Sequence, residues 1–95
     1  MIAFTGPLWL WAGENARWHF ITVPEELSGE LRAHAMASLR GFNSVKARAT
    51  VGNVTWRTSV FPMKSGGYLL PVKADVRRKA GITAGDEVTV ELELL

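Results

Sequence analysis

The sequence contains no cysteine among its 95 residues. This absence excludes disulfide bonds, thiolate metal sites and a cysteine nucleophile. Histidine is scarce as well: His19 and His34 are the only two in the chain, and two isolated histidines make a poor metal site. We therefore expect neither a bound metal nor another cofactor.

The chain also lacks an apolar run long enough to span a membrane. Residues 1–12 are largely apolar, but they contain Thr5, Gly6 and Pro7 and carry no charged leader. A membrane-spanning helix needs about 20 apolar residues. A length of 95 residues suits one domain, over 1–95, with a single hydrophobic core. We expect a soluble, cytoplasmic protein.

Motifs typical of enzymes are missing too. The sequence has no Gly-x-Ser-x-Gly nucleophile motif and no His, Asp and Glu cluster at metal-ligand spacing. Glu25 and Glu26 are adjacent, but successive helical residues point about 100° apart, so these two carboxylates cannot share a proton-transfer site. We expect a protein that binds something rather than an enzyme.

Charged residues are present in quantity, and the two signs are separated along the chain. Residues 40–79 hold nine Lys or Arg and one Asp, whereas residues 80–95 hold four acidic residues and no basic one. Two interpretations follow. The basic segment forms a surface for an anion or a nucleic acid, or the acidic last strand pairs with it across a sheet and neutralises it.

Apolar and polar side chains alternate over residues 45–60, on both sides of Gly52-Asn53. A two-residue loop that begins with glycine favours the type II′ turn of a β-hairpin. That turn places Ala49 opposite Trp56, both toward the core. Small residues then face a large one, as the packed wall of a barrel requires.

The same register places Arg48 directly opposite Arg57 on the outer face, with Lys46 two residues along. Like charges that face each other across two strands destabilise the pair unless an anion lies between them. One candidate anion is the carboxylate of Glu91 or Glu93 in the last strand. The other is a phosphate or carboxylate of a partner, held by Arg48, Arg57 and Lys46.

Residues 74–94 predict a short helix followed by a strand. Basic residues gather at the end of 74–80, where they complement the helix dipole, and Gly81 follows as a left-handed cap. Gly85-Asp86 then turns the chain into 88–94, where apolar and polar side chains alternate with a period of two. We expect a single-turn helix and a last strand with one acidic face.

Two runs rich in aromatic and β-branched residues, 2–11 and 16–23, predict a hairpin at the start of the chain. We expect Leu10 to lie opposite Trp18, which makes one face apolar. The other face then holds Trp9, Trp11, Arg17 and His19. Tryptophan is costly to expose to water, so this face packs under a helix or loop, forms a homodimer interface, or lines a ligand cleft. Arg17 opposite Trp11 would form a cation–π pair.

A helix is expected from Pro24 onward. Proline suits the first helical position, and the two glutamates that follow it suit the positive end of the helix dipole. Its apolar stripe consists of Leu27, Leu31, Ala35 and Leu39. Gly41 is expected to cap its end.

Several segments carry a resemblance to a known family. They are Phe4, Trp18-His-Phe-Ile-Thr-Val-Pro24, Trp56-Arg-Thr-Ser-Val-Phe-Pro62, Tyr68-Leu-Leu-Pro-Val-Lys73, Arg77 and Ala80-Gly-Ile-Thr-Ala-Gly-Asp-Glu-Val88. Over its whole length the chain resembles the bacterial domain-of-unknown-function family 1905. The resemblance implies a mainly β fold: a small double-split β-barrel with one short helix after the second strand and a single-turn helix before the last strand. Transition-state-regulator and antitoxin DNA-binding proteins share that architecture. Relatives are often fused to a helical domain associated with bacteriocin protection, which this sequence does not contain.

Together these observations favour a small, non-catalytic binding module that forms a homodimer. The first alternative is a nucleic-acid-binding protein like an antitoxin or regulator. The basic centre favours it, whereas the acidic last strand and a net charge of only +2 oppose it. The second alternative is a barrel that binds a small molecule or an anion. A shared architecture by itself does not decide between them.

Overall fold

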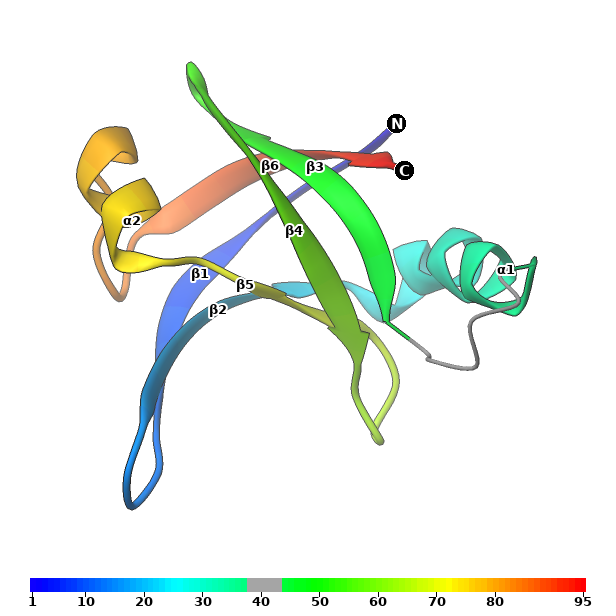
Figure 1. Ribbon diagram of the computed structural model, residues 1–95, viewed down its shortest axis with the longest axis horizontal. Coiled ribbons are helices and arrows are strands. Elements are labelled where there is room, and N and C mark those ends of the chain that lie inside the picture. Colours follow the sequence, from blue (N-terminus) through cyan, green and yellow to red (C-terminus); the bar gives the residue numbers. More distant parts are fainter. Residues whose placement is uncertain (38–43) are drawn as a thin grey trace.

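The computed structural model describes residues 1–37 and 44–95, and in this part of the chain six strands close into a barrel that carries its helices on the outside (Figure 1). In chain order the elements are β1 (Ile2–Ala12), β2 (Arg17–Val23), the 3₁₀ turn η1 (Glu25–Leu27), α1 (Ser28–Ala37), β3 (Val45–Val51), β4 (Val54–Pro62), β5 (Tyr68–Pro71), α2 (Ala74–Ala80) and β6 (Glu87–Leu94). The expectation of a mainly β barrel, with one helix after the second strand and another before the last, is confirmed. None of the helices among the described residues is both long and apolar enough to cross a membrane.

The strands follow the order β1-β2-β5-β4-β3-β6 around the barrel. The long strand β1 pairs antiparallel with β6 through residues 2–7 and with β2 through residues 8–12. In the same way β4 pairs with β3 through residues 54–60 and with β5 through residues 61–62. Each long strand therefore passes from one sheet of the barrel to the other.

The two halves of the chain repeat the same arrangement. The series β1, β2, α1, β3 and the series β4, β5, α2, β6 have equivalent neighbours around the barrel, and α1 and α2 lie on opposite sides of it in Figure 1. The halves differ in detail: β5 has four residues, whereas its counterpart β2 has seven. The site described below lies at the end of the shorter strand, β5.

The central hairpin has the expected register. Val51 lies opposite Val54, and Ala49 lies opposite Trp56. Gly52 has a φ of 60°, which the first central residue of a type II′ turn requires. The alternating apolar residues of β3 and β6 are buried and form much of the core, as the period of two predicts.

Both expected helices are present. After Pro24 the chain makes the turn η1 and continues as α1, in which Leu31 is buried while Leu27 and Ala35 pack against the core. The other stripe residue, Leu39, and the cap Gly41 lie outside the described residues.

The second helix, α2, has the predicted bounds, 74–80. It ends at Gly81, which has a φ of 68° and donates its amide to the Arg78 carbonyl, while the Ile82 amide donates to the Arg77 carbonyl. These bonds satisfy carbonyls that the end of a helix otherwise leaves unpaired.

The expected register of the first hairpin is wrong by one residue. Leu10 lies opposite His19 rather than Trp18, and Trp18 lies opposite Trp11. Because successive side chains of a strand point to opposite faces, a shift of one residue moves each side chain of β2 to the other face relative to β1. The run 2–11 is apolar on both faces, so the alternation of its residues could not select the register.

Candidate functional site

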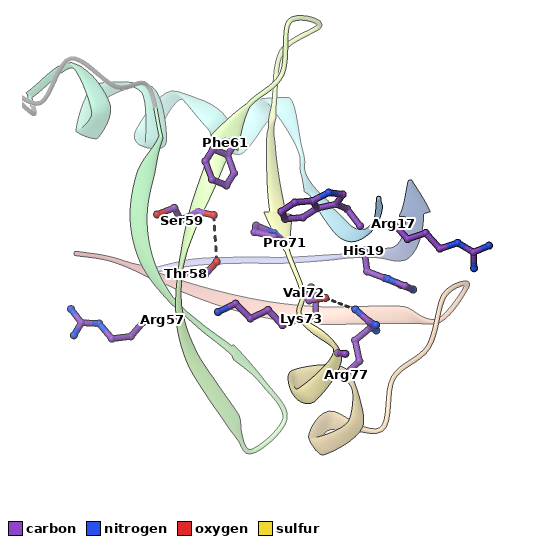
Figure 2. A pocket seen from close by; sticks show the side chains of 12 residues that line it. Arg17, His19, Arg57, Thr58, Ser59, Phe61, Pro71, Val72, Lys73 and Arg77 are labelled. Carbon is purple, nitrogen blue, oxygen red and sulfur yellow. Dashed lines mark hydrogen bonds between the residues drawn. The ribbon is translucent and has the colours of Figure 1, made fainter. Parts of the chain in front are cut away.

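The barrel wall has an opening where β5 ends. β5 pairs with residues 20–23 of β2 and with residues 61–62 of β4. Its last residue, Pro71, has no N–H to donate to a neighbouring strand, and the chain then leaves the sheet to form α2. Beyond this point β2 and β4 are no longer bridged, and a cleft of about 540 Å³ lies between them (Figure 2). In the other half of the barrel, the longer β2 occupies the equivalent place, between β5 and β1.

Cationic side chains dominate the polar part of this cleft. The lining residues are 17–19 of β2, 57–59 and Phe61 of β4, Pro71 of β5, 72–73 after it, and Ala74 and Arg77 of α2. The cationic residues among them are Arg17, Arg57, Lys73 and Arg77, and none of the acidic residues in the described part of the chain lines the cleft. In Figure 2 the side chains of Arg57 and Arg17 lie on opposite sides of the view, with Lys73, His19 and Arg77 between them. A cleft lined by charges of one sign concentrates the electric field and attracts counter-ions.

Arg77 is held in place by the backbone of the cleft. Its Nη1 donates a hydrogen bond of 2.6 Å to the Val72 carbonyl, and the Val72 amide donates one of 2.9 Å to the His19 carbonyl. These two bonds join α2 to the end of β5 and to β2. The other N–H groups of a guanidinium stay available to an acceptor, so Arg77 is a cation of fixed position.

His19 is the one neutral titratable side chain of the cleft. Partial burial lowers the pKa of its imidazole below the usual 6.5, and the positive charge of Arg77 lowers it further. The neutral form of the imidazole is therefore favoured at pH 7. An anion that enters the cleft offsets the charge of Arg77, so it raises the pKa of His19 toward its usual value.

An apolar groove of about 410 Å³ adjoins the cleft. It is lined by Trp9, Trp11, Trp18, Phe20, Phe61 and Leu69. Trp18 and Phe61 line both the groove and the cleft. The planes of Trp18 and Phe20 are parallel to within 3°, with their ring centroids 6.1 Å apart. We call this surface the aromatic groove.

Part of the aromatic groove is rigidly held. The indole N–H of Trp9 donates to the Thr22 hydroxyl at 3.0 Å, and its ring packs at a tilt against Phe20 with centroids 5.4 Å apart. By contrast, Trp11 and Trp18 lie directly opposite each other with 47% and 50% of their surface exposed. Trp9 is thus held in place, whereas Trp11 and Trp18 are exposed enough to contact a ligand.

The structure separates the residues of the expected tryptophan face. Trp9 and Trp11 line the aromatic groove, whereas Arg17 and His19 line the cationic cleft. Arg17 lies opposite Ala12, not opposite Trp11, so the expected cation–π pair is wrong. The one-residue difference in register explains this outcome, because it exchanges the faces of β2.

The expected arginine pair is present, but its members have different surroundings. Arg48 lies opposite Arg57, as predicted. Arg48 donates to the Glu93 carboxylate at 2.5 Å, whereas Arg57 lines the cleft. Glu91 lies opposite Thr50 instead. Lys46 lies on the exposed outer face of β3, outside the cleft lining.

Sequence reasoning did not assign Lys73 or Arg77 to a site. Both follow β5, where the position of the basic run 77–79 at the end of a helix predicts a partner of the helix dipole. Of that run, Arg77 turns into the cleft, while Arg78 and Lys79 do not line it. A signal was present nonetheless, because Lys73 and Arg77 both belong to the segments that carry the family resemblance.

A family model described as "Domain of unknown function (DUF1905)" matches residues 4–92. The chain belongs to this family. The DUF1905 match includes every residue that lines the cleft and the groove. No curated protein is similar enough to match the chain. Within residues 1–37 and 44–95, no three His, Asp or Glu side chains are grouped closely enough to hold a metal ion.

Proposed function

We propose that this DUF1905 chain is a non-catalytic binding module that holds an anionic ligand in the cationic cleft. One observation carries the proposal. Four cationic side chains of the chain, from β2, β4 and the segment after β5, line a single cleft that contains no carboxylate. A volume of about 540 Å³ lies within the usual range of ligand sites.

The contrast between two arginines supports this proposal. Arg48 is neutralised by Glu93, and this is the only ion pair among the described residues. Within residues 1–37 and 44–95, none of the cations of the cleft forms an ion pair with an acidic side chain. Gathering like charges costs free energy, and a bound anion removes that cost while accepting charge-assisted hydrogen bonds.

The composition of the lining indicates which anions fit. Arginine guanidinium groups bind phosphate or carboxylate oxygens in pairs. Trp18, Phe61, Pro71 and Val72 add an apolar surface beside these cations. A ligand with a phosphate or carboxylate next to an apolar part therefore suits the cleft better than a bare ion does.

The polar side chains of the cleft favour binding over catalysis. Thr58 and Ser59 carry hydroxyl groups there, and His19 carries a neutral imidazole. A hydroxyl nucleophile needs a hydrogen-bonded base, which in turn needs a group that orients it. Among the described residues no hydrogen bond joins either hydroxyl to His19; the Thr58 hydroxyl donates at 3.4 Å to the Ser59 carbonyl instead.

The proposal is tested by titration with inorganic pyrophosphate at low ionic strength, monitored by tryptophan fluorescence. Arg57→Ala and Lys73→Ala should each weaken binding about tenfold, since a hydrogen bond to a charged group contributes about 1.5 to 3 kcal/mol. Lys46→Ala is the matched control, because it removes an exposed cation outside the cleft. It should change the affinity less than about twofold.

Two results would overturn the proposal. One is the absence of binding at millimolar pyrophosphate by a protein that is folded by circular dichroism. The other is an equal loss of affinity in Lys46→Ala and Arg57→Ala, which would show that net charge alone attracts the anion.

A further inference from the structure

The cationic cleft and the aromatic groove form one continuous surface. Trp18 and Phe61 line both of them, so a single ligand can lie with one part in the cleft and another part in the groove. One side of this surface offers four cations, and the other offers only apolar and aromatic side chains. A complementary ligand therefore carries anionic groups and flat rings next to each other.

From this adjacency we infer that the ligand is a single-stranded nucleic acid whose phosphates lie in the cationic cleft and whose bases stack in the aromatic groove. The inference rests on the proposed function, because it names the class of anion that the cleft holds. Proteins that bind single strands combine these two features: a positive groove that follows the backbone, and aromatic rings on which bases stack.

The geometry of the rings favours unpaired bases. Trp11 and Trp18 are about half exposed, so their rings are accessible to a base beside the cations, and Trp18 already stacks parallel to Phe20. In a duplex the faces of the bases are covered by their neighbours, whereas a single strand can turn its bases outward onto such rings.

The extent of the surface favours a strand over a mononucleotide. Arg57 and Arg17 lie on opposite sides of the cleft, with Lys73 and Arg77 between them (Figure 2). The cleft and the groove together provide two volumes, of about 540 and 410 Å³. Cations that are spread along the cleft in this way suit the successive phosphates of a strand better than a single phosphate.

The charge beside the groove also argues against a second copy of the chain as its occupant. Two copies that joined their aromatic grooves about a twofold axis would each place a cationic cleft next to the interface. Like charges brought together in this way weaken the association. A polyanion, by contrast, neutralises the same cations.

The test compares three ligands by fluorescence anisotropy at low salt: an oligothymidylate of eight nucleotides, an abasic oligomer with the same number of phosphates, and the corresponding duplex. The oligothymidylate should bind at least about tenfold more tightly than the abasic oligomer, because each stacked base adds to the affinity. Its affinity should fall with salt with a log-log slope of about −0.7 for each phosphate neutralised.

Trp11→Ala should reduce the advantage of the oligothymidylate and leave the affinity for the abasic oligomer within about twofold, because Trp11 lines the groove but not the cleft. Trp11 is about half exposed, so its loss should not unfold the protein, and Trp11→Phe should restore most of the advantage by restoring a ring. Met36→Ala is the control, since Met36 is an exposed apolar residue of α1, away from both sites.

Each outcome decides a different question. Equal affinity for the oligothymidylate and the abasic oligomer would overturn base stacking and leave the proposed anion binding intact. Equal affinity for the duplex would likewise overturn the assignment to single strands, and thymidine monophosphate binding as tightly as the octamer would overturn the assignment to a strand. Failure of all ligands, pyrophosphate included, would overturn the proposed function itself. If the wild type sediments at twice the monomer mass and Trp18→Glu sediments as a monomer, the groove binds a second copy of the chain.

Discussion

Arg48 and Arg57 lie directly opposite each other on the outer face of the β3–β4 hairpin, yet only Arg48 has a carboxylate partner. Glu93 of β6 lies opposite Arg48 on its other side and accepts its hydrogen bond. Arg57 belongs to the strand that borders the cleft. Neutralisation by the last strand thus accounts for Arg48, while Arg57 is one of the cations that we assign to a ligand.

The first prediction concerns this ion pair. Glu93→Gln should lower the free energy of unfolding by about 0.2 to 1 kcal/mol, because the pair with Arg48 is half exposed and such pairs contribute little. The effect should shrink in high salt. Glu91→Gln is the matched control, since Glu91 faces Thr50. Urea unfolding at two salt concentrations measures both variants, and equal effects of the two changes would contradict the assigned pair.

The second prediction concerns Trp56, which packs against the core from β4. Its indole N–H is buried and has no hydrogen-bond partner among the described residues, and such an unpaired donor costs about 1 to 3 kcal/mol. Trp56→Ala should lower the free energy of unfolding by about 3 kcal/mol through the cavity that it leaves. Trp56→Phe should stay within about 1 kcal/mol of the wild type, because the loss of the unpaired donor offsets the smaller ring. Urea unfolding measures both variants. A similar loss of stability in the two would show that the unpaired donor does not destabilise the folded protein.

The third prediction compares two glycines of helices. Gly81 caps α2 with a φ of 68°, so Gly81→Ala should destabilise the protein by about 1 kcal/mol. Gly29 lies within α1, and a Cβ atom added there meets nothing within 4 Å. Gly29→Ala should therefore stabilise the protein by up to about 1 kcal/mol. Thermal unfolding should shift in opposite directions, and shifts of the same sign would be inconsistent with these helix bounds.

The fourth prediction concerns pH. Burial, and then the charge of Arg77, lowers the pKa of His19 in the folded protein below its usual 6.5. The unfolded chain therefore takes up this proton at a higher pH than the folded protein does, so His19 favours the unfolded state as the pH falls. Its contribution to stability is complete above about pH 6.5 and is lost as the pH falls through the folded pKa.

Urea unfolding between pH 5 and pH 8 tests this dependence. The wild type should lose more stability toward pH 5 than His19→Gln does, because the variant has no imidazole to protonate. Subtracting the curve of the variant removes the contribution of the carboxylates. If the two curves run parallel, the environment of His19 does not lower its pKa.

The central hairpin, α2 and the last strand could be predicted from the sequence with their register or bounds. Their signals are local: a period of two on both sides of Gly52-Asn53, basic residues before Gly81, and a turn at Gly85-Asp86. Turn type and cap conformation depend on a few neighbouring residues, so a single sequence contains enough information to specify them.

The first hairpin shows where local information ends. β1 is apolar on both faces and its loop to β2 is longer than two residues, so neither the alternation nor the turn selected the register. In the structure β2 also pairs with β5, from Val23 opposite Tyr68 to Phe20 opposite Pro71. That pairing between distant segments orients the faces of β2, and with them Trp18 and His19.

By itself, therefore, the sequence determined the strands, the helices and the pairing of Arg48 with Arg57, because periodicity and turn chemistry act between near neighbours. Only the tertiary structure decided the site. The cleft exists because β5 ends at Pro71 while β2 and β4 continue past it, and these two strands come from distant parts of the chain. Closure of the barrel brings Arg17, Arg57, Lys73 and Arg77 together. No spacing along the chain encodes that arrangement, since it depends on which strands pair and on how far each one extends.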